Sequence, residues 1–291
     1  MSTVILALIT GVGLGALYFL VSSGLSLIYG LMHVLNFAHG VFLSLSAFVG
    51  WEVACRMDAS TWGGFLVSVL VGALVGAAFA ALTELALIRP LYERHIEQVL
   101  VTVGLSLAAI ALFDGIWGTD PIYISGPDWL RQTTAVLGAK IPNVYWLLMV
   151  VAAVVLAGLV LFLRRTRYGV IIRAGVENRA MVTALGIDVR RSFTLVFAIG
   201  GAAAGIGGVL AAQWAGYVSS GLGQTLLIFA FIVTIIGGLG SLAGAAIASV
   251  LVAVLQQFAN FFLAGTGDFI VVVLLAVVLL VRPSGLLGRK A

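Results

Sequence analysis

The fold is decided by residues 164–191, RRTRYGVIIRAGVENRAMVTALGIDVRR. This stretch holds seven of the fifteen lysines and arginines and two acidic residues, so its net charge is +5 (seven positive minus two negative). Long apolar segments flank it on both sides. Cytoplasmic loops of membrane proteins are enriched in Lys and Arg. We therefore expect a cytoplasmic loop here, which fixes the orientation of the chain.

Part of this loop is expected to be helical. Beyond Tyr168 and Gly169, Arg173 and Glu177 have the i,i+4 spacing of a helical ion pair. Gly186 stands where a glycine can close a helix. The pattern predicts a short helix on the cytoplasmic face, where it can serve as a docking surface for another protein.

The composition is typical of a membrane protein. Of the 291 residues, 62% are hydrophobic and 9% are charged, and the mean hydropathy is +1.21. Soluble domains carry about 25% charged residues. The polar gaps are too short to enclose a separate soluble domain, so we expect one domain over residues 1–291 and any energy-supplying domain on another chain. The net charge of +4 comes from alternate loops, which all lie on the same side of the membrane. It therefore indicates the orientation of the chain and not nucleic-acid binding.

Apolar segments predict an all-α polytopic membrane protein with eight or nine transmembrane helices. We expect them at residues 4–30, 41–51, 62–88, 98–117, 144–163, 192–214, 225–236, 246–262 and 269–281. The pieces at 225–236 and 269–281 are shorter than the roughly twenty residues that span a bilayer, so they are expected to be tilted, extended by their flanks or broken. With residues 164–191 inside, nine crossings place the N-terminus outside. A re-entrant piece would reduce the count to eight.

Polar side chains interrupt the apolar sequence in LMHVLNFAHG, residues 31–40. At membrane depth, Asn36 and His39 need hydrogen-bonding partners or a water-filled cavity. One interpretation is that they line a translocation pathway. The alternative is a turn at the start of a helix, with Asn36 as its cap. Thr102 and Ser106 are further candidates for the pathway, one turn apart on the fourth span.

Glu84 is another candidate for the pathway. It follows Gly72, Gly76 and Ala80 at four-residue steps, so a face of small residues ends in a carboxylate. Such a face lets another helix approach closely, which directs Glu84 toward that neighbour. The alternative partner is Arg89, reached by snorkelling near the membrane edge.

A second glycine-rich segment is GGLGSLAGA, residues 237–245. It superficially resembles a dinucleotide-binding turn, but the acidic residue that should follow about twenty positions later is missing. We instead expect a hinge or break between half-helices at four glycines, namely Gly237, Gly238, Gly240 and Gly244.

Enzymatic and metal-dependent functions are disfavoured. The sequence has no P-loop, and its three histidines lack the spacing of a metal site, so we expect neither a metal nor a cofactor. Gly265–Asp268 matches the Gly-x-Gly-Asp of intramembrane aspartyl proteases, yet Asp114 is the one candidate for the second aspartate. An ion-coupled secondary transporter would carry ionisable groups deep in its spans, whereas the spans here carry small residues. The pattern favours a passive pore driven by another subunit.

Several motifs together resemble the LivH-type permeases of branched-chain amino acid ABC importers. The matching segments cover nearly the whole chain in order: GLSLIYGLMHVLNFAHGVFLSLSAFVGW (24–51), RPLYERHIEQVLVTVGLSL (89–107), WGTDP (117–121), YGVIIRAGVENRAMVTALGIDV (168–189), FAIGGAAAGIGGVLAA (197–212), GGLGSLAGA (237–245) and RPSGLLGR (282–289).

The resemblance implies a multi-pass subunit of the bacterial inner membrane, with ATP hydrolysis on separate chains. Its expected partners are a second homologous permease, two cytoplasmic ATP-binding subunits and a periplasmic substrate-binding protein. The resemblance also implies that the loop at 164–191 carries the coupling helix, with Arg173, Glu177 and Asn178 near the ATPase. Urea and short-chain amide importers use very similar permeases, so these solutes stay open as alternatives to leucine, isoleucine and valine.

Overall fold

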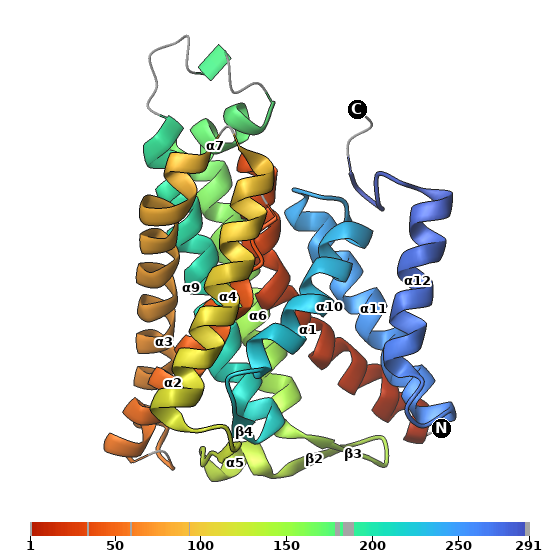
Figure 1. Ribbon diagram of the computed structural model, residues 1–291. Coiled ribbons are helices and arrows are strands. Elements are labelled where there is room, and N and C mark those ends of the chain that lie inside the picture. The colour runs from red at the N-terminus through yellow and green to blue at the C-terminus, as the bar shows by residue number, and fades with distance from the viewer. Residues whose placement is uncertain are drawn as a thin grey trace.

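Long helices make up most of the computed structural model (Figure 1), which describes residues 2–33, 35–58, 60–92, 94–177, 181–182 and 189–288. The long helices are α1 (Ser2–Met32), α2 (His39–Arg56), α3 (Trp62–Thr83), α4 (His95–Trp117), α6 (Asn143–Arg165), α9 (Val189–Ala215), α10 (Leu222–Gly237), α11 (Leu242–Phe262) and α12 (Gly267–Val281). The shorter elements are the π-helix η1 (Glu84–Ile88), the 3-10 helix η2 (Arg89–Leu91), α5 (Asp128–Arg131), α7 (Arg167–Glu177), β1 (Ile122–Tyr123), β2 (Thr133–Val136), β3 (Ala139–Pro142) and β4 (Tyr217–Val218).

The helices confirm the polytopic all-α prediction. Six of them are long and apolar enough to cross a membrane, as judged over the described residues. The helices α10 and α12 have 16 and 15 residues. Each is longer than the apolar run from which it was predicted, because flanking residues extend the helix. At 1.5 Å per residue they are about 24 and 22 Å long, less than the hydrocarbon thickness. The total of eight or nine crossings stays a prediction.

The polar loops lie at two opposite ends of the molecule. The N-terminus lies at the same end as α5 and the β2–β3 hairpin, while α7 and the C-terminal segment lie at the other end (Figure 1). The connection between α4 and α6, residues 118–142, contains short strands. Strands β2 and β3 pair antiparallel in this region, and β1 pairs with β4. The hairpin turns at Leu137 and Gly138, which both have positive φ angles, as its tight geometry requires.

Glycines bring α9 into backbone contact with its neighbours. A Cβ on Gly205 would lie 2.2 Å from the carbonyl oxygen of Gly72 on α3. One on Gly24 of α1 would lie 2.4 Å from the carbonyl oxygen of Gly200 on α9. Real Cβ atoms do not approach so closely, so only glycine permits these contacts. Helix α9 therefore packs closely against α1 through Gly200 and against α3 through Gly205, and these three helices form the centre of the fold.

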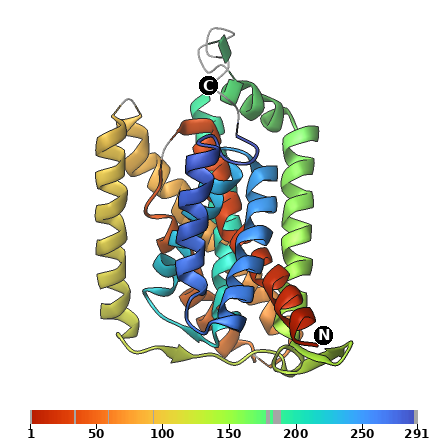
Figure 2. The ribbon, with the colours of Figure 1, turned by 90° about the vertical axis from the view of Figure 1, so that its right-hand side faces the viewer.

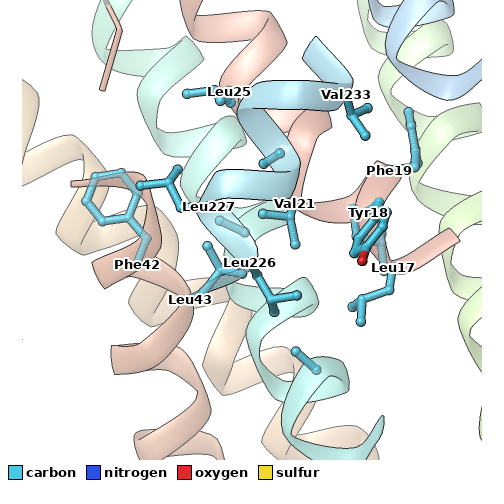
Figure 3. Close-up of a cluster of buried hydrophobic side chains, with 14 of the residues drawn as sticks. Leu17, Tyr18, Phe19, Val21, Leu25, Phe42, Leu43, Leu226, Leu227 and Val233 are labelled. Carbon is cyan, nitrogen blue, oxygen red and sulfur yellow. The ribbon is translucent and has the colours of Figure 1, made fainter. Parts of the chain in front are cut away.

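Buried apolar side chains join α1, α2 and α10 (Figure 3). The ring of Tyr18 stacks on Phe229, with centroids 5.0 Å apart. The other members are buried, and Figure 3 labels them as Leu17, Phe19, Val21, Leu25, Phe42, Leu43, Leu226, Leu227 and Val233. Helix α4, in contrast, stands at the side of the bundle (Figure 2). Its exposed apolar residues include Ile96, Leu100, Leu107 and Leu112, as expected of a face toward lipid or another subunit.

Candidate functional site

The candidate site begins where the chain leaves α1. His39 Nε2 lies 3.0 Å from the carbonyl oxygen of Val21. Val21 precedes the end of α1 at Met32 by eleven residues, or about 16 Å of helix. Residues 35–38 therefore lie back alongside α1, and α2 begins deep inside the molecule. Non-helical backbone is tolerated at such depth only where protein or a water-filled cavity surrounds it.

Asn36 and His39 are completely buried, and each has a polar atom without a partner. Asn36 Oδ1 accepts a hydrogen bond from the Ala38 amide at 3.0 Å, which folds the turn before α2. Its Nδ2 has no partner among the described residues, and the same holds for His39 Nδ1. Because a carbonyl only accepts, His39 Nε2 carries the proton toward Val21, and a neutral ring leaves Nδ1 as an acceptor. The site thus offers one donor and one acceptor for a ligand.

Thr102 and Ser106 join α4 to this region. The Phe37 amide donates to Thr102 Oγ1 at 3.3 Å. Ser106 Oγ donates to Gln224 Oε1 on α10 at 3.0 Å. Thr102 therefore bonds to the segment that carries Asn36, whereas Ser106 bonds to α10. The amide of Gln224 was missed, although its position just before the apolar run 225–236 was a signal of an isolated polar group.

The N-terminal ends of α2 and α10 touch each other. A Cβ on Gly223 would lie 1.9 Å from the carbonyl oxygen of Gly40. Ser44 Oγ also accepts from the Gly223 amide at 3.0 Å and donates to the Ser220 carbonyl at 2.8 Å. The N-terminal end of a helix carries partial positive charge, so the meeting point of two such ends favours a negatively charged group.

Glu84 lies between α3 and α9. Its carboxylate accepts hydrogen bonds from the Tyr92 hydroxyl and, at 2.6 Å, from Thr194 Oγ1. The predicted orientation toward a neighbouring helix is confirmed. The alternative ion pair with Arg89 is wrong, since Glu84 forms no salt bridge within the described residues. Among the described residues, no hydrogen bond or ion pair joins Glu84 to Asn36, and the place of Glu84 on the pathway stays a prediction.

The glycine-rich segment forms the turn between α10 and α11. Gly238 and Gly240 have φ angles of 98° and 82°, and a Cβ on Gly244 would lie 2.0 Å from the Gly237 carbonyl oxygen. The C-terminal segment binds to this turn, because the Leu287 amide donates to the Gly237 carbonyl at 3.0 Å. The predicted break is thus a turn between α10 and α11, and the C-terminal segment binds to it. Its action as a hinge stays a prediction.

The basic loop contains the expected short helix, α7. Its exposed Arg173 lines a cleft of about 780 Å³ with His33 and Gly240. Gly175 of α7 approaches Leu31, since its Cβ would lie 3.0 Å from Leu31 Cδ1. The side chain of Glu177, and both Asn178 and Gly186, lie outside the described residues, so the predicted ion pair and helix end are not described.

The chain has the features of a polytopic helical membrane transport subunit. These are long apolar helices, buried polar groups where two helix ends meet, and a basic loop at one end of the molecule. The chain belongs to the family described as branched-chain amino acid transport system / permease component, which matches residues 7–281.

Individual relatives match nearly end to end. The permease protein BraD of a high-affinity branched-chain amino acid transport system in Pseudomonas aeruginosa is 30% identical over 292 residues, covering 97% of this chain and 95% of the relative. The corresponding LivH protein of Escherichia coli K12 is 29% identical, with 96% and 94% covered. A probable LivH of Methanocaldococcus jannaschii is 28% identical, with 92% and 88% covered. Solved structures offer no match.

Proposed function

We propose that this chain forms half of the translocation pathway of an ATP-binding-cassette importer for branched-chain amino acids. Its single permease domain, residues 1–291, would pair with a second homologous permease, two cytoplasmic ATP-binding subunits and a periplasmic substrate-binding protein. The family membership and the names of the relatives support this proposal.

The orientation follows from charge. The loop at 164–191 lies on the cytoplasmic side; nine crossings then place the N-terminus outside, and a re-entrant piece would leave eight crossings. The position of α7 and the C-terminal segment at one end, with the N-terminus at the other, supports this arrangement (Figure 1). The exposed Arg173 then faces the ATPase, with Glu177 and Asn178 as further predicted coupling residues, and closure of the ATPase moves α7.

The proposal rests on two buried polar atoms near the start of α2, Asn36 Nδ2 and His39 Nδ1. Neither has a hydrogen-bond partner among the described residues. Asn36 Nδ2 can donate to the carboxylate of an amino acid, beside the N-terminal ends of α2 and α10. His39 Nδ1 can accept from its ammonium group. A buried polar group without a partner costs about 1–3 kcal/mol, so a zwitterion that satisfies both groups recovers this cost. Buried apolar residues on the same two helices, such as Leu43 on α2 and Leu227 on α10, suit a branched side chain.

Reconstitution in liposomes tests this function. The purified complex, supplied with ATP and its binding protein, should take up labelled leucine in preference to urea and acetamide. Preferential uptake of urea or acetamide would replace the substrate but keep the importer class. Uptake by this chain alone, driven by an ion gradient, would refute the importer class and favour a secondary transporter.

A further inference from the structure

One face of α4 carries polar side chains into the bundle. Gln98, Thr102 and Ser106 follow one another at four-residue steps, and all three are buried. The opposite face is apolar and exposed, as at Ile96 and Leu107. Polar groups that face inward in a membrane helix need partners or a polar path. Thr102 and Ser106 have partners outside α4, described above, and Gln98 completes the same face toward the start of the helix.

The amide of Gln98 is satisfied at one end. Its Nε2 donates to the carbonyl oxygen of Leu91. Its Oε1 is buried and has no hydrogen-bond partner in the part of the chain that the structure describes. The bond to Leu91 fixes the orientation of the amide, because a rotated amide would place two oxygens against each other. Oε1 is therefore an acceptor without a donor, and it can be reached from inside the bundle but not by a subunit bound to the outer surface.

A helix end beside Gln98 favours a cation. Residues Trp62–Leu91 form one continuous helical span, so Leu91 lies at its C-terminal end. The last carbonyl groups of a helix give this end a partial negative charge. The positive end of α4 also begins here, but the acidic Glu97 in its first turn offsets that charge. Arg89 lines a cleft with residues of α7 and α9 and does not bond to Gln98 Oε1.

Helix α4 is held less firmly at this end than at the other. At its far end, Trp117 stacks on Phe48 with centroids 4.5 Å apart. Its start lies at the end of the molecule that carries α7 (Figure 1). In this half, the Phe37 amide bonds to Thr102 at 3.3 Å, which is long for an N–H···O bond. The start of α4 can therefore separate from the segment before α2, and this separation would open Gln98 to the pathway.

We propose that Gln98 Oε1 accepts a hydrogen bond from the ammonium group of the amino acid as it leaves toward the cytoplasm. Gln98 lies one turn of α4, or about 6 Å, closer to the cytoplasmic end than Thr102. The helix ends that favour a carboxylate, at α2 and α10, are thus followed by one that favours an ammonium group. The inference rests on the proposed function and orientation, and it adds a second binding position for the same substrate.

Uptake kinetics in liposomes, with ATP inside and leucine-loaded binding protein outside, test this site. Gln98→Leu should lower kcat for leucine about tenfold, the effect of a lost hydrogen bond to a charged group. KM should be unchanged, because the site is reached after entry. Gln98→Glu keeps an acceptor oxygen but loses the donor to Leu91, so it should transport several times faster than Gln98→Leu. His95→Leu is the control, since His95 lies in the same turn on the exposed side.

Two analogues separate ammonium binding from a structural role of Gln98. Leucinamide has the ammonium group without the carboxylate, and 4-methylpentanoate has the carboxylate without the ammonium group. At equal concentration on both sides of the membrane, leucinamide should slow leucine uptake by the wild type more strongly. Gln98→Leu should remove this difference. If Gln98→Leu does not assemble, Gln98→Met, with a side chain of similar length, takes its place.

Each other outcome counts against the site. A wild-type kcat in Gln98→Leu would mean that water serves Oε1. A kcat of Gln98→Glu as low as that of Gln98→Leu would mean that the bond to Leu91 is what matters. A preference for leucinamide that persists in Gln98→Leu would assign the ammonium group to another residue, and sodium dependence that is lost in this variant would indicate a metal ion. Absence of leucine uptake by the wild type would instead refute the proposed function.

Discussion

Gly223→Ala tests whether the contact between α2 and α10 holds the candidate site together. The added methyl carbon would lie 1.9 Å from the Gly40 carbonyl oxygen and 2.7 Å from Ser44 Oγ. Close carbon–oxygen contacts in proteins are about 3.3 Å, so the helices must separate by about 1.4 Å. Such a separation lengthens the 3.0 Å bond from the Gly223 amide to Ser44 Oγ beyond hydrogen-bond distance.

The two effects of this substitution add. Overpacking of a tight contact costs about 1–3 kcal/mol, and the lost buried hydrogen bond costs about 1 kcal/mol. We therefore expect Gly223→Ala to lower the free energy of unfolding by about 2–4 kcal/mol. The change runs against the usual effect of Gly→Ala inside a helix, which is a gain of about 0.5–1 kcal/mol. Gly158→Ala in α6 is the control, because no neighbouring atom lies within 4 Å of its Cβ position.

The assay is denaturant unfolding of the purified complex, followed by tryptophan fluorescence, together with leucine uptake in liposomes. Gly223→Ala should unfold at lower denaturant concentration and transport slowly. Gly158→Ala should match or exceed the wild type in stability. If Gly223→Ala unfolds and transports like Gly158→Ala, the contact between the two helix ends does not organise the site and the reasoning is refuted.

Three further substitutions test other parts of the structure. Asn36→Asp keeps the oxygen that accepts from Ala38 but places a carboxylate where the substrate carboxylate is expected, so KM for uptake should rise at least about tenfold with assembly intact; an unchanged KM would remove Asn36 from the site. Thr194→Val removes a donor to the buried Glu84 and should lower the free energy of unfolding by about 1–3 kcal/mol, whereas an unchanged unfolding curve would mean that water replaces the hydroxyl. Gly285→Ala introduces a side chain at a φ of 77°, so the C-terminal segment should detach from the α10–α11 turn and become sensitive to protease; equal cleavage of variant and wild type would contradict this.

The long helices could be predicted because their signals are local. Apolar runs end at charged or polar residues, and the segment expected at 144–163 is the helix Asn143–Arg165. Spacing of small residues likewise predicted that the face with Gly72 packs tightly, and its close contact with Gly205 confirms this. The basic loop predicted α7 for a similar reason, since i,i+4 spacing is a property of a single helix.

The assembly of the site could not be predicted, because it depends on pairs that are far apart in the chain. Ser106 and Gln224 are 118 residues apart, and the partner of Glu84 is 110 residues away at Thr194. Local patterns do not specify which helices become neighbours. The same holds for the C-terminal segment, whose bond to Gly237 satisfies a carbonyl at the end of α10 that hydropathy alone leaves without a partner.

The contacts of α7 give a physical route from the proposed ATPase surface to the pathway. Gly175 approaches Leu31, which is buried in the last turn of α1. Asn36 follows Leu31 by five residues, in the segment that turns back into the molecule. The glycine contacts of α9 with α1 and α3 are too close to slide without backbone clashes, so the centre of the fold resists motion. A displacement of α7 would therefore act first on the end of α1 and on residues 35–38, which include Asn36 and are bonded to Thr102 through the Phe37 amide.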